Sequence, residues 1–368
     1  MLLPSGVAPL SPLHGARLTL KMGNWWQIIN IDKRESSQHL WGQLGSWFFY
    51  PHEHLLSHIS IPCLPPDVDE WLTEGATALQ SGPLAYMPVE ILDLFFDELR
   101  GLHEVIYLAI TCKHLLNVGK RHVLRASREY YAPWVGCRLI SLDDSTRSLD
   151  DLPPNMLTQG EVKEIEETSL SDCEFEEVER SLSNFSARYC ARVFHREWKQ
   201  PRINDAHNFV QRLYGWRTPP SPAEGNEEVS EDSAVERDVD MFKTLYGDGR
   251  HPSYPAGVRV LCNLSKGEYV RADGLTVPTY ANLAHALLAR ICWTSHQDVG
   301  MVCADDYRPQ LTGGAWAGDR FCVTSLNSLA ELEMEAGATE WKDMTSEVSD
   351  LLTHIWENNS LRWVVFCK

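Results

Sequence analysis

The sequence lacks the short motifs with which enzymes commonly hold phosphate groups, dinucleotides or a catalytic metal ion. None of the patterns G-x-x-x-x-G-K-[ST], G-x-G-x-x-G, G-x-S-x-G and H-E-x-x-H occurs in the 368 residues. Acidic pairs stand at 143–144, 150–151 and 305–306, but their neighbours are polar and turn-forming, where aspartates normally cap helices and solvate loops. We therefore expect no catalytic residues, no cofactor and no enzymatic activity.

Positive charge is also in short supply. The chain has 33 basic and 51 acidic residues, which gives a formal net charge of -18. Such a field repels phosphate groups, so we expect neither nucleic acid nor a membrane as a partner. No apolar run approaches the length of a bilayer span. Residues 1–21 have prolines at positions 4, 9 and 12 and no basic start, which predicts a loose extension rather than a signal peptide.

Closely spaced cysteines are absent as well. The 10 cysteines stand singly between Cys63 and Cys367, without any C-x-x-C pair. A disulfide framework would be denser and the chain shorter, so we expect reduced, mostly buried thiols in a cytoplasmic or nuclear protein. By contrast, 13 tryptophans and a hydrophobic fraction of 43% are enough for one large domain or two ordinary ones with real cores.

One histidine-rich stretch is the best candidate for a metal site. On a helix, His54 and His58 would lie one turn apart, a spacing that suits Zn²⁺. No third ligand is evident nearby, and prolines at 51 and 62 bracket the stretch as a short surface helix. We favour solvated histidines and expect no metal.

Composition divides the chain into segments. We expect a strand and loop region at 22–86, helices at 87–126, a strand at 127–142, an acidic linker at 143–184 and a helical segment at 185–217. Residues 218–254 are rich in Pro, Ser and Glu and predict a disordered loop. Residues 255–368 predict a mixed α/β part. The expected fold class is α+β, a short helical motif joined to a strand-containing domain with acidic flexible loops.

Apolar patterns place individual elements in these segments. Strands are expected at 25–31, at 258–264 and 267–270 around a Ser265-Lys266 turn, at 287–293 and at 320–324. A helix is expected near the C-terminal end, where apolar residues recur at helical spacing. Its apolar face consists of Val348, Leu351, Leu352, Ile355 and Trp356.

A weak internal echo links two distant segments. W-V-G-C-R-L-I at 134–140 resembles W-A-G-D-R-F-C at 316–322. One interpretation is a duplicated ligand-binding turn. We favour the simpler interpretation, in which two glycine turns lead into strands, a tryptophan anchors each turn, and each arginine faces solvent or a carboxylate.

The most informative segment spans residues 87–116. Pro88 suits the first turn of a helix, and apolar residues follow at helical spacing on one wide face, namely Ile91, Leu92, Phe95, Phe96 and Leu99. Gly101 ends that helix, and a second apolar set and a third short helix follow. Three short helices cannot enclose a core of their own. Another part of the chain or a second protein must therefore cover some of their apolar surface.

This segment resembles the F-box family. Its start, M-P-V-E-I-L-x-x-F-F-D-E-L at 87–99, is similar to the family's L-P-x-E-L-L…I-F-x-x-L. Its later part, L-A-I-T-C-K-H-L at 108–115, is similar to L-x-x-V-C-K-R-W, with Leu115 in place of the family's tryptophan. The resemblance implies a substrate-recruiting subunit of a ubiquitin ligase, bound through a Skp-type adaptor to a cullin scaffold, with an unknown target protein. The adaptor-binding residues that it implies are Met87, Pro88, Ile91, Leu92, Phe95, Leu99, Leu108, Cys112 and Leu115.

One alternative interpretation and one additional resemblance stand beside this interpretation. The helical hairpin could instead be buried in its own core, in a non-catalytic structural or interaction protein. The flanking pieces at 26–34, 41–45, 131–134 and 316–321 resemble uncharacterised, F-box-like fungal proteins of basidiomycete type. That resemblance implies no activity, but it predicts that the blocks around the acidic linker assemble into one fold.

Overall fold

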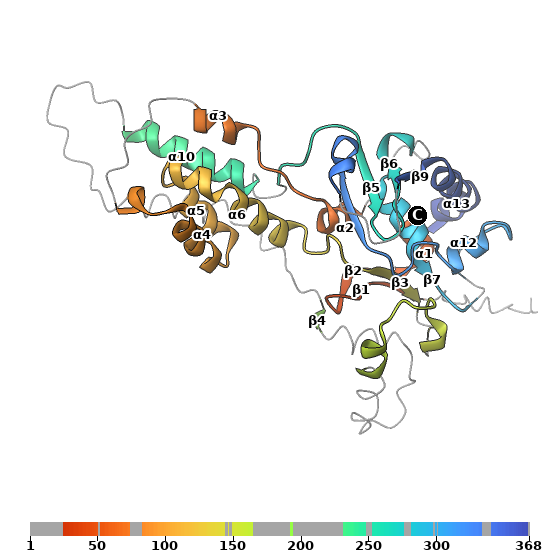
Figure 1. Cartoon of the computed structure of the whole chain (residues 1–368). Coiled ribbons are helices and arrows are strands. Elements are labelled where there is room, and N and C mark those ends of the chain that lie inside the picture. Colours follow the sequence, from red (N-terminus) through yellow and green to blue (C-terminus); the bar gives the residue numbers. More distant parts are fainter. Residues whose placement is uncertain are drawn as a thin grey trace, which may run out of the picture.

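The computed structural model describes most of the chain as two lobes joined by a long helix (Figure 1). The described residues are 25–50, 52–73, 83–143, 146, 149–164, 192–193, 231–247, 252–275, 281–296, 299, 301–332 and 340–366. One lobe is a bundle of helices and the other contains two β-sheets covered by helices, so the fold class is α+β as predicted. Within the described residues, no helix is long and apolar enough to cross a membrane.

The helical lobe, here called the helical module, contains the segment that resembles an F-box. Its elements are α3 (Asp67–Thr73), η1 (Pro83–Tyr86), α4 (Val89–Glu98), α5 (Leu102–Ile110), α6 (Lys113–Tyr131) and α10 (Glu231–Tyr246). Local capping explains the boundaries. The Glu104 carboxylate accepts the Gly101 N–H at 3.2 Å where α5 begins, and Cys112 Sγ accepts the Leu115 N–H at 3.4 Å where α6 begins.

The second lobe contains two sheets. The first has the order β4-β2-β1-β3-β7, and its strands are β1 (Trp25–Asn30), β2 (Glu35–Gln43), β3 (Leu139–Asp143), β4 (Arg192–Val193) and β7 (Cys292–Trp293). The second has the order β8-β5-β6-β9, and its strands are β5 (Arg259–Asn263), β6 (Glu268–Arg271), β8 (Phe321–Ser325) and β9 (Lys342–Asp343). The remaining elements are α1 (Leu44–Trp47), α2 (Glu53–Ile59), η2 (Leu149–Asp151), η3 (Ala272–Gly274), α11 (Leu283–Ile291), α12 (Arg308–Thr312), η4 (Leu326–Glu331) and α13 (Thr345–Phe366).

The two sheets repeat one arrangement. In each, a hairpin is followed by a helix, and a third strand then pairs antiparallel with the first strand of the hairpin. We call β1, β2, α2 and β3 the first copy, and β5, β6, α11 and β8 the second copy. The registers agree next to the hairpin turn, where Asn30 pairs with Glu35 and Leu139 just as Asn263 pairs with Glu268 and Phe321, and the first hairpin has a register shift between Gln27 and Ile29 that the second lacks. A short parallel strand lies against each hairpin, β4 in the first copy and β9 in the second.

Six identical residues hold equivalent places in the two copies. Each hairpin turn carries Asn, Lys and Glu, and each loop before the third strand carries Trp, Gly and Arg. The pairs are Asn30 with Asn263, Lys33 with Lys266, Glu35 with Glu268, Trp134 with Trp316, Gly136 with Gly318, and Arg138 with Arg320. Both tryptophans are fully buried, and their indole N–H groups donate to Glu35 and Glu268 at 2.8 and 2.5 Å.

The two copies interlock around Gly136 and Gly318. The N–H of Gly136 donates to the Phe321 carbonyl at 2.8 Å, and the N–H of Gly318 donates to the Leu139 carbonyl at 2.9 Å. Both glycines have positive φ, 72° and 83°, which a side chain would strain. The echo at 134–140 and 316–322 is thus a pair of glycine turns leading into strands, each anchored by a buried tryptophan.

In each copy, the residue that follows the helix pairs with a strand of the other copy. Ser60, just after α2, forms a parallel bridge to Val323 in the second copy, and Cys292, just after α11, pairs in parallel with Ser141 in the first. Much of one hydrophobic core is consequently shared, and its large side chains with the least exposure include Trp26, Phe48, Trp134, Trp316 and Phe321. The expectation that blocks far apart in the sequence assemble into one fold agrees with this arrangement.

The helical module from α3 to α6 is inserted into the first copy, whereas its helix α10 follows β4 in the chain. The chain leaves that copy after Ser60 and returns at Trp134, whose N–H donates to the His58 carbonyl at 2.9 Å. The second copy has the same contact, from the Trp316 N–H to the Arg290 carbonyl, also at 2.9 Å. The described residues of the equivalent excursion in the second copy carry one helix, the short α12.

Several sequence predictions are confirmed and others are wrong. The strands near 25–31, 258–264, 267–270 and 320–324 and the C-terminal helix are present. The strand predicted at 287–293 is mostly helix α11, because its apolar run is buried on every side rather than on one sheet face. The strand predicted at 127–142 starts only at Leu139, because α6 continues to Tyr131.

The prediction of a disordered loop over 218–254 is wrong for α10. Its residues Met241, Phe242, Leu245 and Tyr246 are buried against the helical module. The acidic residues that precede them dominate the composition of that stretch and hide a short apolar face. The extension at 1–21 and the helical segment at 185–217, apart from β4, lie outside the described residues.

Candidate docking surface

Helix α4 presents three different sides. Leu92 and Phe96 are buried in the helical module, with Leu99 half-buried beside them. Asp93 and Asp97 face α6. The predicted single apolar face of α4 is therefore divided, because only part of it packs inward.

The third side of α4 is apolar and exposed. Ile91, Leu94 and Phe95 have exposed fractions of 41%, 60% and 49%, and their i, i+3, i+4 spacing places them in one stripe. We call these three residues the α4 stripe. Tyr86 and Val89, just before it, are also exposed. In the described part of the chain, five of the seven exposed large apolar side chains thus lie within ten residues.

The orientation of α4 is fixed by ion pairs with α6. Asp93 pairs with Arg121 and accepts from His122 Nε2 at 2.9 Å, and Asp97 pairs with Arg125 at 2.8 Å. The hydrogen bonds from His122 and then Arg121 lower the pKa of Asp93. Because these pairs bind the acidic side of α4 to α6, they direct the α4 stripe away from the bundle.

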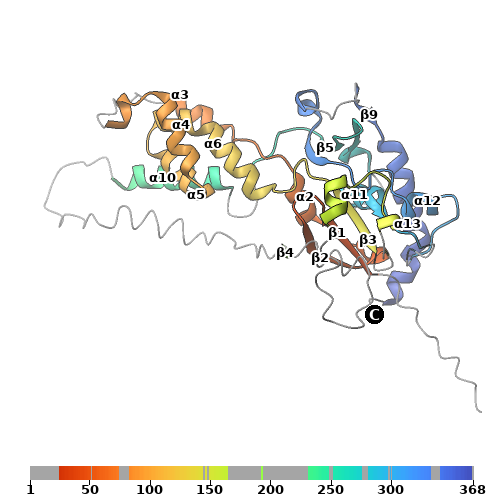
Figure 2. The same ribbon diagram turned by 60° about the horizontal axis from the view of Figure 1, so that its bottom comes forward.

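Other parts of the chain cover much of the remaining surface of helices α4, α5 and α6. Phe242 of α10 stacks on Tyr107 of α5 with ring centroids 4.8 Å apart, and the Tyr131 hydroxyl donates to the Tyr246 carbonyl. Figure 2 shows α10 lying along α5. On the other side, Asp69 of α3 pairs with Lys120 at 2.5 Å. The chain therefore closes much of the bundle while leaving the α4 stripe exposed.

The residues that the F-box resemblance assigns to an adaptor do not lie on one surface. Pro88, Ile91 and Phe95 are exposed, whereas Leu92 and Leu115 are buried. The half-buried ones are Met87, Leu99, Leu108 and Cys112. Sequence reasoning missed Leu94, the most exposed member of the α4 stripe, because it lies off the face defined by Leu92 and Phe96.

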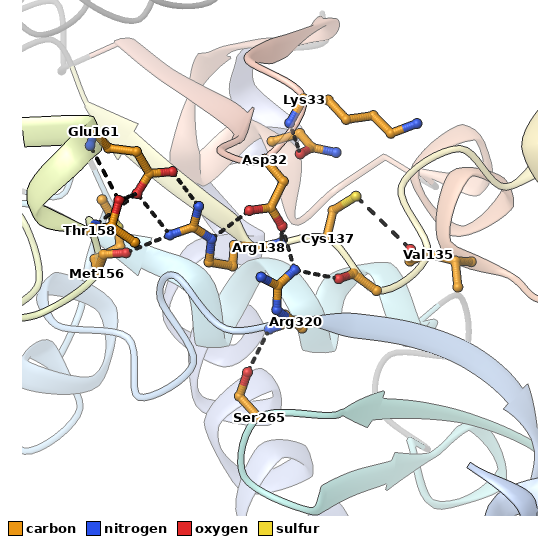
Figure 3. A network of polar contacts seen from close by, with 12 residues as sticks. Asp32, Lys33, Val135, Cys137, Arg138, Met156, Thr158, Glu161, Ser265 and Arg320 are labelled. Carbon is orange, nitrogen blue, oxygen red and sulfur yellow. Dashed lines mark hydrogen bonds and ion pairs between the residues drawn. The ribbon is translucent and has the colours of Figure 1, made fainter. Parts of the chain in front are cut away.

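A second cluster of charged residues lies where the two copies meet (Figure 3). Asp32 accepts from Arg138 Nε at 2.7 Å and from Arg320 Nη1 at 2.6 Å. Arg138 also donates to the Met156 carbonyl at 2.8 Å and pairs with Glu161 at 2.5 Å. Both arginines of the internal echo therefore face one carboxylate, as the simpler interpretation predicted.

This cluster acts as a clamp rather than as a site for a ligand. Burial alone would raise the pKa of Glu161, but hydrogen bonds from Arg138 and Thr158 lower it to about 2, so the carboxylate stays charged. Asp32 lies in the turn of one hairpin, and its two partners precede β3 and β8. Arg138 forms ion pairs with Asp32 and Glu161 across these elements, and these pairs hold the two copies together.

The histidine-rich stretch is a helix, but not a solvated one. His52 and His58 are buried, and His52 Nε2 contacts the Trp47 carbonyl at 2.6 Å. His285 of α11 lies 5.9 Å from His52 between ring centroids. The expectation of exposed histidines was wrong because α2 packs against α11 in the shared core. No group of three or more possible metal ligands occurs among the described residues.

Comparison with protein families, characterised proteins and solved structures finds no match to this chain. The shape and chemistry of the α4 stripe are therefore the main physical guide to function.

Proposed function

We propose that the chain is an F-box-like protein that recruits a target protein to a Skp/cullin-type ubiquitin ligase without catalysing a reaction itself. The α4 stripe carries the proposal, because Ile91 and Phe95 are exposed at positions where the family motif places adaptor contacts. Helices α3 and α10 pack against other surfaces of the bundle. A second protein would supply cover for the stripe.

Burial of the stripe would stabilise a complex appreciably. A helix that lays i, i+3 and i+4 apolar residues against a partner groove is a common mode of recognition between proteins. Each large apolar side chain contributes roughly 1.5–3 kcal/mol when it is fully removed from water. Three such side chains and Pro88 are enough for specific docking when the partner is preorganised.

The alternative is a non-catalytic interaction protein whose hairpin serves only its own core. The burial of Leu92 and Leu115 favours that alternative for half of the motif. The two functions differ at the α4 stripe, which is needed for docking but not for the core. By this proposal the protein acts in the cytoplasm or nucleus, where such ligases work.

The test is co-purification of the full chain with a Skp-type adaptor. We expect a stable complex, and we expect Ile91→Asp and Phe95→Asp to abolish it while the urea midpoint stays within experimental error. Leu124→Asp, at an exposed apolar residue of α6, is the matched control and should bind normally. A wild-type chain that is folded and fails to bind the adaptor would contradict the proposal.

A further inference from the structure

The two copies differ at one equivalent position in a chemically informative way. Asp319 stands in the second copy where the first has Cys137, three residues after the buried tryptophan in each case. The surrounding residues are conserved between the copies, Asn30 matching Asn263 and Lys33 matching Lys266. An equivalent asparagine and lysine thus accompany a carboxylate in one copy and a thiol in the other, although Asp32 of the first copy is replaced by Ser265 in the second.

The second copy shows what these surroundings bind. The Asp319 carboxylate accepts the Asn263 amide at 2.8 Å and the Lys266 ammonium at 2.6 Å. The Asn263 side-chain oxygen accepts the Ser265 and Lys266 N–H groups at 3.0 and 3.1 Å, which fixes the direction of the amide. This is a built cradle for a singly charged anion.

The first copy keeps the buried amide of this cradle, its lysine is exposed, and a thiol stands in place of the anion. The Asn30 side-chain oxygen accepts the Lys33 N–H at 3.0 Å, so the amide is held as in the second copy. Asn30 is fully buried, and its Nδ2 group faces the weakly accepting Cys137 sulfur and meets no acceptor in normal hydrogen-bond geometry. A buried donor without a strong acceptor destabilises the fold, so this site is primed for a negative charge.

We infer that Cys137 is a site of oxidative modification, at which a peroxide converts the thiol to a sulfinate that the Asn30 and Lys33 cradle retains. A cysteine sulfinate has the shape of an aspartate, with sulfur in place of the carboxyl carbon and two oxygens in place of the carboxylate oxygens. Modified Cys137 therefore reproduces the Asp319 arrangement of the second copy. Figure 3 shows Cys137 beside the Asp32 clamp, with Lys33 on the same turn as Asp32.

The chemistry requires two molecules of peroxide. In the first step the thiolate attacks one peroxide oxygen, the O–O bond breaks, and a sulfenate and water form after proton transfer. In the second step the sulfenate sulfur attacks another peroxide, and a sulfinate and a second water form. Sulfur loses four electrons and each peroxide gains two.

Opposing effects on the pKa of the Cys137 thiol set the rate of the first step. Burial raises the pKa of the Cys137 thiol, whereas the Asn30 amide and the charges of Lys33 and Arg320 lower it and Asp32 raises it. The thiol has an exposed fraction of 8%, so a small oxidant is required. We therefore expect slow formation of the sulfinate and strong retention once it forms.

The first experiment treats the folded full-length chain with hydrogen peroxide and follows each cysteine peptide by mass spectrometry. We expect Cys137 to gain two oxygen atoms and to stop there. Asn30→Asp keeps the acceptor for the Lys33 N–H but removes the donor, so we expect at least a tenfold lower yield of sulfinate. Absence of oxygen at Cys137, or an equal yield in the Asn30→Asp variant, would overturn the inference.

A second experiment tests the cradle without an oxidant. An aspartate introduced at a buried position normally destabilises a fold. Here Cys137→Asp should leave the urea midpoint unchanged or raise it, while Cys292→Asp, at a fully buried cysteine without such a cradle, should lower it sharply. Combining Asn30→Asp with Cys137→Asp should lower the midpoint by more than the two single changes together. Equal losses for Cys137→Asp and Cys292→Asp would show that no cradle exists.

Discussion

Phe96 lies flat against His122, with ring centroids 5.0 Å apart and planes inclined by 13°. The contact joins α4 to α6 at the point where the two carboxylates of α4 meet the basic side of α6. It depends on Gly119 of α6, because a Cβ atom there would lie 2.7 Å from the Phe96 ring and 3.1 Å from the Ala109 side chain.

Gly119→Ala is therefore expected to destabilise the helical module, although alanine is the better helix former. Overpacking of this kind costs about 1–3 kcal/mol. Urea unfolding of the full chain measures the loss. Gly160→Ala is the control, because a Cβ atom there meets only Thr158 Oγ1 at 4.0 Å, and it should be neutral or stabilising. Equal behaviour of the two variants would contradict the close packing of Phe96 on α6.

Stability is expected to fall on mild acidification because His285 is buried as the neutral imidazole. Its Nδ1 accepts the Asn282 N–H at 3.1 Å, so Nε2 carries the proton that points to the Tyr50 carbonyl at 3.1 Å. Burial, then the charge of His52, lowers the pKa of His285 from 6.5 to about 4. The folded state resists protonation, so its stability is complete above pH 6.5 and falls as the pH drops toward 4.

The loss from His285 should reach about 3 kcal/mol across that window, by the usual conversion of a pKa shift. Burial lowers the pKa of His52 as well, which adds to the same trend. Urea midpoints between pH 7 and pH 4 measure the effect. His285→Gln cannot titrate and should flatten the curve, even if it is less stable at neutral pH. An unchanged slope would show that folding does not lower the pKa of His285.

The two copies are expected to respond alike to equivalent substitutions. Trp134→Phe and Trp316→Phe each shrink a fully buried side chain and leave a glutamate without its indole donor. Each should cost about 2–3 kcal/mol, from the lost volume and the lost hydrogen bond. Thermal unfolding should give similar losses for the two variants. A large loss in one and none in the other would contradict the equivalence.

Removal of the shared carboxylate should loosen the junction between the copies. Asp32→Ala leaves Arg138 and Arg320 without their common acceptor, and we expect a loss of about 2–4 kcal/mol because Arg138 is largely buried. Asp273→Ala breaks the exposed pair with Arg271 and should have no measurable effect. Comparison of urea midpoints measures both, and similar outcomes would mean that Asp32 is not a clamp.

Much of the second lobe could be predicted because its strands follow local rules. The turn at Ser265-Lys266 separates two apolar runs, and the helix near Trp356 has a regular apolar stripe, so both are visible in short windows of sequence. The run at 287–293 could not be assigned in this way, because a helix buried on all sides has no polar face to reveal its period.

The repeat was only half visible in the sequence. The echo between the tryptophan turns shows one part of it. The other part, N-I-D-K-R-E at 30–35 and N-L-S-K-G-E at 263–268, has three identical residues among six and becomes evident from the strand register. The division of α4 was also beyond sequence reasoning. Leu92 is buried in a cluster to which α10, over a hundred residues away, also contributes, so only tertiary structure separates Leu92 from Ile91 and Phe95.

The insertion of the helical module between His58 and Trp134 has a mechanical consequence. The chain crosses between the lobes near 61–66, at the end of α6 and near 247–258, and the Cys63 N–H donates to the Ser253 carbonyl at 2.9 Å. Among the described residues, these three crossings and the 19-residue helix α6, about 28 Å long, make a stiff strut rather than a tether. Whatever docks on the α4 stripe is thereby held at a set distance and angle from whatever the sheet lobe carries.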